Sequence, residues 1–354
     1  MFTKDISANY KLRVVKSDHK DWDTYVRRHP KGSIFHTAAM IRVLAATRGL
    51  TPYAYAATDA AGSIVALLVS CHIKTLPQLA VMSSRAVQFA EPLCDRNAIG
   101  VVALTKLIAK HDEHMRSRSL LSEVRTVSEP CYEKVPLTMS GYVHRDYINY
   151  VVDTSKDTET LSKKVNKRLR QKIRSTIRRG VVVRDDETVE GIERLYELLR
   201  VSYGRAKVPL LGKDLFENAL EYLPPGSVRL RTAFKNDRAI ASIVSLVYGD
   251  RVFSWYGGTM RLKGLSPFAC IVWDDIAWSS ENGFAHYDFG GAGWPHENYG
   301  PRKFKGSFGG KRVHYGRYTL TYSGLRLKVA EFAYQMSRRM GAWSGVEKTG
   351  KRPR

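Results

Sequence analysis

The sequence lacks the usual signatures of a metalloprotein or a disulfide-bonded protein. It has only four cysteines, spread through 354 residues: Cys71, Cys94, Cys131 and Cys270. No CxxC pair occurs, and the string HDEH, which holds His111 and His114, has no further ligand pattern near it. We therefore expect no metal site, and reduced, mostly buried thiols as in a cytoplasmic protein.

Long apolar runs and nucleotide motifs are also missing. No segment reaches the roughly 18 apolar residues needed to span a bilayer, and no signal peptide opens the chain. We expect a cytoplasmic protein whose membrane contact, if it has any, is peripheral and at the inner face. The absence of GxxxxGK[ST], GxGxxG and GxSxG patterns argues against nucleotide hydrolysis, dinucleotide redox chemistry and a serine nucleophile.

Acidic residues are few relative to basic ones. The chain has 57 Lys+Arg against 34 Asp+Glu, and of its net charge of +23 only +7 lies in residues 1–150, which leaves +16 for the remainder. A polyanionic partner is therefore expected for the second half. Hydrophobic residues make up 44% of the chain, and its length suits two globular domains of roughly 150 to 180 residues.

Hydrophobic spacing predicts a mixed α/β unit that occurs twice. The first half should contain helices over 34–50 and 100–118, with strands over 53–58, 64–73, 121–127 and 147–152. The second should contain helices over 189–203 and 213–222, with strands over 228–234 and 239–248. AATDAAGSIVALLVS from Ala56 and TAFKNDRAIASIVSL from Thr232 share one order of strand, polar turn and small-residue-rich strand, which indicates an internal duplication.

The most basic stretch lies between the two units. Residues 163–179 hold nine cations and no acid, and apolar residues recur every four positions, which predicts one helix ended by Gly180. A solvated connecting helix is one interpretation. The other is a phosphate-binding helix at the junction of the domains, with Lys167, Arg170 and Arg174 as contacts to a polyanion such as tRNA.

Two further segments suggest ligand chemistry. Residues 287–310 combine many glycines and aromatics with clustered cations, a setting suited to phosphate or a developing oxyanion, although a solvated surface hairpin would have the same composition. The string RLKGLS, with Arg261, Lys263 and Gly264, precedes a helix expected over 268–280. It is close to the RxxGx[GA] loop with which GNAT acyltransferases hold coenzyme A, except for Ser266, or it is an ordinary turn.

Taken together, these strings resemble the Fem-type aminoacyltransferases, which are built from two GNAT-like domains. The resemblance runs from about residue 33 to 317 and rests on GSIFHT, KRLRQKIRSTIRRGVVV, SYGRAKVP, SWYGG, NGFAHYDFGG and FKGSFGG. Fem-type enzymes move an amino acid from aminoacyl-tRNA to an amine of a cell-wall precursor. One departure concerns the acceptor: Met40 and Leu44 stand where enzymes acting on nucleotide-linked muropeptides tend to have tryptophan and lysine.

The resemblance also implies roles for individual residues. Lys305 would stabilise charge on the acyl carbonyl or on the terminal phosphate of the donor. Asp288 would position the amine or accept its proton, unless that aspartate only holds its own turn. Arg205 would hold the phosphate of the acceptor. Further residues expected to bind substrate are these: Phe304, Tyr256, Trp255 and Arg302.

The expected architecture is α/β with mixed sheets, in two tandem GNAT-like domains over 1–155 and 156–325. The second would begin with the basic helix, 156–180, and a C-terminal helix and basic tail would occupy 326–354. The expected activity is N-acyl transfer from aminoacyl-tRNA, without a tightly bound cofactor, to an amine-bearing small molecule, peptide or glycan precursor. The alternatives are acyl-CoA-dependent acylation of an amino sugar or exopolysaccharide unit, and a non-catalytic nucleic-acid-binding protein.

Overall fold

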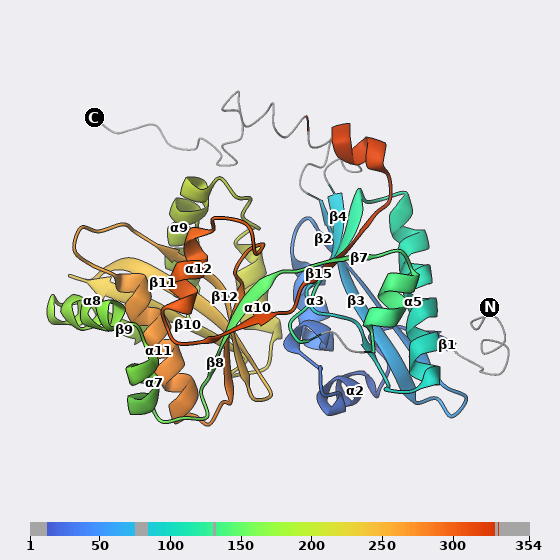
Figure 1. Ribbon diagram of the computed structural model, residues 1–354, viewed down its shortest axis with the longest axis horizontal. Helices are drawn as coiled ribbons and strands as arrows, with labels where there is room; N and C mark the ends of the chain where they lie inside the picture. The colour runs from blue at the N-terminus through green and yellow to red at the C-terminus, as the bar shows by residue number, and fades with distance from the viewer. Residues whose placement is uncertain (1–12, 75–83, 130–131, 330–331, 333–354) are drawn as a thin grey trace.

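The computed structural model describes residues 13–74, 84–129, 132–329 and 332, which form two lobes side by side (Figure 1). Each lobe is built on a mixed sheet that carries helices. The helices are α2 (Trp22–Arg28), the short 3-10 helix η1 (Ile34–His36), α3 (Ala38–Ala46), α5 (Ala98–Arg116), α6 (Lys134–Met139), α7 (Thr158–Lys164), α8 (Lys167–Arg178), α9 (Val189–Ala206), α10 (Asp214–Tyr222), α11 (Pro267–Glu281) and α12 (Gly300–Gly306).

The two sheets follow one strand plan. The strands are β1 (Arg13–Val15), β2 (Leu50–Thr58), β3 (Ile64–Lys74), β4 (Ser84–Gln88), β5 (Leu93–Cys94), β6 (Leu121–Arg125), β7 (Val143–Arg145), β8 (Ile148–Asp153), β9 (Val182–Asp185), β10 (Val228–Lys235), β11 (Arg238–Tyr248), β12 (Arg251–Thr259), β13 (His286–Gly291), β14 (Lys311–His314) and β15 (Arg317–Thr321). The first sheet runs β1-β2-β3-β4-β6-β15-β7 and the second, from its other edge, β9-β10-β11-β12-β13-β8-β14. In both, only the fourth and fifth strands pair in parallel. The duplication predicted from the two hairpins is therefore confirmed at the level of topology.

The sheets exchange one strand. β8 comes from the first half of the chain but is the sixth strand of the second sheet, and β15 returns from the second half to the same place in the first sheet (Figure 1). The two crossing links lie against each other, since the Gly316 N–H donates to the Tyr147 carbonyl at 3.2 Å. The predicted boundary at residue 155 divides the chain but not the sheets, because β8 before it pairs in the second sheet and β15 after it pairs in the first.

The predicted hairpins form as expected. β2 pairs with β3, and β10 with β11, each in antiparallel register. The turn between β10 and β11 places Asn236 and Asp237 at φ of 49° and 54°, a conformation that these two residue types tolerate better than most. Such turns set the register that buries β3 and β11 almost along their whole length.

The basic segment differs from the prediction in two ways. The single helix expected over 163–179 is broken into α7 and α8, because Asn166 caps α8 by accepting from the Arg168 N–H and donates its own N–H to Ser307. Figure 1 also shows α8 at the left edge of the second lobe, away from the first, so the expected place at the domain junction is wrong. The predicted stop at Gly180, with φ of 82°, is confirmed.

An apolar core joins the two lobes. Met40 and Leu44 of α3 belong to the same buried cluster as Leu215 and Phe216 of α10. The two positions at which the chain departs from the Fem pattern therefore carry core side chains. This packing is why α3 lies against the second lobe.

Some predictions concern parts of the chain outside the description. The C-terminal helix expected near 325–343 lies mostly outside the described residues, as does Cys131. The other three cysteines are buried. Within the described ranges, no helix is both long and apolar enough to cross a membrane.

Candidate active site

The site lies where β12 and β13 separate. These parallel strands pair only from Arg251 and His286 to Phe253 and Asp288, and beyond that point they diverge. Gly290 adopts φ of 64°, and a side chain there would meet the Phe253 ring at 3.3 Å. Glycine at this position therefore lets the end of β13 turn away and expose its carbonyl groups.

Asp288 holds this turn from within the protein. Its side chain is completely buried; one carboxylate oxygen accepts from the Gly290 N–H at 2.8 Å, and the other from Arg251 Nη1 at 2.9 Å. Burial raises the pKa of Asp288, while Arg251 and the Gly290 N–H oppose that shift. Both oxygens are thus engaged in supporting the strand end.

Lys305 is fixed against the same strand end. Its Nζ donates to the carbonyls of Phe289 at 2.6 Å and Gly291 at 2.7 Å. Burial lowers the pKa of the Lys305 ammonium to about 8, and the Asp288 carboxylate limits that fall. An ammonium has three N–H donors, so one remains for a ligand. This lysine is not the solvated cation of a surface hairpin.

Aromatic packing positions the helix that carries Lys305. Phe304 lies 5.1 Å from Phe308 in an edge-to-face arrangement and 5.8 Å from Phe268, which begins the first turn of α11. Phe308 is buried in the core of the second lobe. Phe304, predicted to bind substrate, therefore anchors α12 to α11.

Arg302 holds the loop that follows β13. Its guanidinium donates to the carbonyls of Ala292 and Pro295, each at 3.0 Å, and to that of Trp294. A guanidinium has five N–H donors, and these three contacts use most of them. Few donors remain for a substrate. The position predicted from sequence is near the site, but the side chain serves the loop.

The other predicted substrate residues lie on β12 and at the end of α9. Tyr256 and Trp255 of β12 border a small apolar cavity between the lobes, together with Phe35 and Phe89. Burial raises the pKa of Tyr256. Arg205, at the end of α9, donates to the Thr259 carbonyl at 2.6 Å. Its guanidinium is therefore bonded to the last residue of β12.

The RLKGLS loop connects β12 to α11 and touches the basic helix. Gly264 has φ of 76°, its carbonyl accepts from Arg179 at 3.2 Å, and the Ser266 N–H donates to Thr176 at 3.0 Å. Arg261 and Lys263 are exposed. The loop and α8 therefore form one basic surface.

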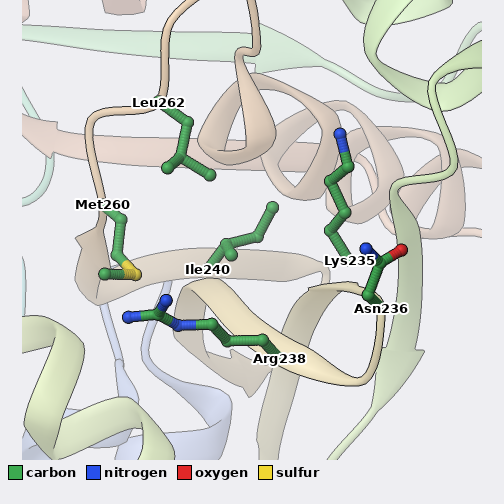
Figure 2. A pocket seen from close by; sticks show the side chains of 6 residues that line it. All are labelled: Lys235, Asn236, Arg238, Ile240, Met260 and Leu262. Atoms are coloured by element: carbon green, nitrogen blue, oxygen red, sulfur yellow. The ribbon is translucent and has the colours of Figure 1, made fainter.

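A groove continues from this loop (Figure 2). Its volume is about 240 Å³, and Figure 2 shows Met260, Leu262 and Ile240 on its apolar side, with Lys235 and Arg238 nearby. Apolar floors with a cationic rim suit a ligand that carries both a ring and a phosphate.

The cations of α8 remain uncompensated. None of the salt bridges between described residues involves α8, and Lys167, Lys172 and Arg174 are exposed. Arg170 differs, because its Nη1 donates to the Ser162 carbonyl at 2.6 Å and ties α7 to α8. Of the predicted polyanion contacts, Lys167 and Arg174 are available, whereas Arg170 is partly used within the protein.

Sequence reasoning missed Arg251 as the partner of Asp288. The two residues are 37 positions apart, and no spacing rule connects them. The only available signal was the position of Arg251 at the start of the strand RVFSWYGG. No group of three or more candidate metal ligands occurs among the described residues, and His111 is engaged with Ser70 and Asp112.

Residues 163–303 match the family model described as an acetyltransferase (GNAT) domain. The match covers the second lobe from α8 to β13. The whole chain, with its two sheets of one plan, has a tandem GNAT fold, as the resemblance predicted. No curated protein sequence matches it.

Solved structures extend this likeness to both lobes. FemX is similar over 92% of this chain and 99% of its own, with a TM-score of 0.66 and 15% identity. L-PGS from Bacillus licheniformis is similar over 92% of this chain and 98% of its own, with a TM-score of 0.55 and 12% identity. A tandem GNAT protein of the clavulanic acid biosynthesis pathway is similar over 89% of this chain and 99% of its own, with a TM-score of 0.55 and 10% identity. At these identities the likeness concerns the fold.

Proposed function

We propose that this protein transfers an aminoacyl group from aminoacyl-tRNA to an amine acceptor, a cell-wall precursor or peptide-like metabolite, with Lys305 as the electrostatic catalyst. The observation that carries the proposal is the Lys305 ammonium, held by two backbone carbonyls with one N–H left over. A solvated lysine side chain would lose conformational entropy when it is fixed on a ligand, whereas this side chain is already held in place.

The chemistry requires little beyond position and charge. The acceptor amine attacks the ester carbonyl, a C–N bond forms, and the bond from the acyl carbon to the ribose oxygen breaks. The proton lost by the amine ends on that departing oxygen. Negative charge develops on the carbonyl oxygen, and the free N–H of Lys305 would stabilise it by about 3–4 kcal/mol.

The tRNA would lie on the basic surface of α8. The start of α8 is bonded to the end of α12, since the Asn166 N–H donates to the Ser307 carbonyl at 2.8 Å. Ser307 is two residues from Lys305. A backbone bound along α8 would therefore have a short route for its acylated end to the β12–β13 opening.

Replacing Lys305 with Met tests the proposal. The variant keeps the apolar stem and removes the charge, so we expect the fold to survive and kcat to fall roughly 10²- to 10³-fold. Lys303→Met is the matched control, because Lys303 is exposed in the same helix and should retain the parent rate. Equal rates in Lys305→Met and the parent would remove the catalytic assignment of Lys305. Binding of tRNA without any acyl transfer by the parent would instead favour a protein that only binds nucleic acid.

A second donor, an acyl-CoA, is favoured by one specific feature. The RLKGLS loop, with Gly264 at φ of 76°, stands between β12 and α11 beside the groove of Figure 2. Phosphates at a helix N-terminus and a ring in the groove would suit this donor, with an amino sugar or exopolysaccharide unit as the acceptor. The protein should be offered charged tRNA and acetyl-CoA in parallel with a panel of amines. Thiol release without tRNA deacylation would replace the first donor by the second.

A further inference from the structure

Four arginines lie on one face of four adjacent strands in the first sheet. Arg317 of β15 stands directly opposite Arg125 of β6 on one side and Arg145 of β7 on the other. The register between β4 and β6 puts Arg85 on the same face. Like charges in directly opposed positions destabilise a sheet, so this arrangement calls for a compensating anion.

The protein supplies only part of that compensation. Glu123 pairs with Arg125 Nε at 2.5 Å and with Arg317 Nη1 at 3.3 Å. Among the described residues, no ion pair involves Arg85 or Arg145. Burial lowers the pKa of the Arg317 guanidinium, Glu123 opposes that shift, and the Arg125 charge adds to it. Four guanidiniums against one carboxylate leave three positive charges uncompensated.

This arginine face looks toward the second lobe. The opposite face of the sheet is covered by α5, where Val124 and Tyr318 are buried in the core. The Arg317 guanidinium lies 3.7 Å from the centre of the Tyr147 ring, and the Tyr256 hydroxyl interacts electrostatically with Arg125 and Arg85. Arg317 therefore lies against Tyr147, and Arg85 and Arg125 lie near Tyr256.

Tyr147 connects this face to the strand end that holds Lys305. Gly291, whose carbonyl accepts from Lys305, lies under Tyr147 so closely that an added Cβ would come within 2.5 Å of its ring. Tyr147 thus contacts both Arg317 and the end of β13 to which Lys305 is bonded. A ligand bound by the arginines would be separated from the catalytic lysine by about one side chain.

We propose that the arginine face of the first sheet binds a phosphate monoester or diphosphate carried by the amine acceptor. This inference rests on the proposed acyl transfer. Guanidinium forks match phosphate oxygens, and a group with two or more negative charges balances the excess better than a carboxylate. Arg205, to which the resemblance gives the acceptor phosphate, is instead bonded to the Thr259 carbonyl.

Arg85→Met is the most informative variant. Arg85 has no hydrogen bond or ion pair to another described residue, so removing its guanidinium takes a partner from none of them. Calorimetric titration of the full chain with inorganic pyrophosphate should show binding in the parent and a roughly 10- to 100-fold weaker Kd in Arg85→Met, the range for one charge-assisted contact. Arg317→Lys, which keeps the charge and loses the fork, should also weaken binding.

Two controls make the result decisive. Arg42→Met removes an exposed arginine from α3 and should bind pyrophosphate as the parent does. Acetate should bind far more weakly than pyrophosphate. Equal pyrophosphate affinity in Arg85→Met and Arg42→Met, or equal binding of acetate and pyrophosphate, would overturn the inference. Binding to tRNA, measured in parallel, tests the donor separately, because it should depend on α8 and not on Arg85.

Discussion

Neighbouring cations of one short helix have different physical roles. Lys305 is bonded to two carbonyls of β13, Arg302 clamps the loop after β13, and Lys303 is exposed. Composition places all three in one cluster, but of the three Lys305 is the one bonded to β13 itself. The adjacent Asp288 supports it, because that carboxylate keeps the Lys305 pKa higher than burial alone would leave it.

Asp288→Asn should separate support from proton transfer. If Lys305 acts as the ammonium, the rate should decline as the pH rises through about 8, where the lysine loses its proton. Without the carboxylate that raises this pKa, the decline should move to lower pH. Rate profiles of parent and variant with the same acceptor would measure the shift. Loss of activity at every pH would instead make Asp288 a proton acceptor.

At the scale of an element, the notable feature of α8 is its unpaired positive charge. Its exposed cations have no carboxylate partners among the described residues, and its apolar side rests on α11 through Ile173 and Cys270. The cations of such a helix repel one another, and this repulsion is reduced when a polyanion binds. Its connection to α12 relates this surface to Lys305.

Reversing Lys172 and Arg174 to Glu should weaken tRNA binding and flatten its salt dependence. Each lost phosphate contact reduces the slope of log K against log salt by roughly 0.7 to 0.9. These positions are exposed, so the fold should persist. The matched control reverses Lys106 and Lys110, which are exposed on α5 of the first lobe. An equal effect of both double variants would point to overall charge rather than to a site on α8.

For the whole molecule, the exchanged strands make each lobe depend on the other half of the chain. β8 pairs with β13 on one side and β14 on the other, and Val152 is buried among residues of the second lobe. A fragment of residues 156–354 would lack this inner strand and expose two unpaired edges, on β13 and β14.

We therefore expect the isolated fragment 156–354 to show no cooperative unfolding transition. Co-expression with residues 1–155 should restore one, because the missing strand is then supplied. The intact chain should unfold in a single calorimetric transition, with equal calorimetric and van't Hoff enthalpies. Cooperative unfolding of the fragment alone would mean that β8 is dispensable.

Local patterns were sufficient for much of the fold. The hairpins after Ala56 and Thr232 were predictable because side-chain alternation and turn residues act within a few positions. The helix break before α8 was not, since it depends on the bond from Asn166 to Ser307, far along the chain. Ile177 continues the apolar spacing and yet is exposed, because spacing along a helix does not reveal which of its positions a neighbouring element will cover.

The sequence by itself determined the duplicated α/β plan, the excess of positive charge in the second half and the glycine-rich segment around Lys305. Tertiary structure alone decided which strands cross between the sheets, which cations are free to meet a ligand, and that Arg251 supports Asp288. The reason is physical: propensity and periodicity are properties of short segments, whereas burial and pairing depend on residues brought together from distant parts of the chain.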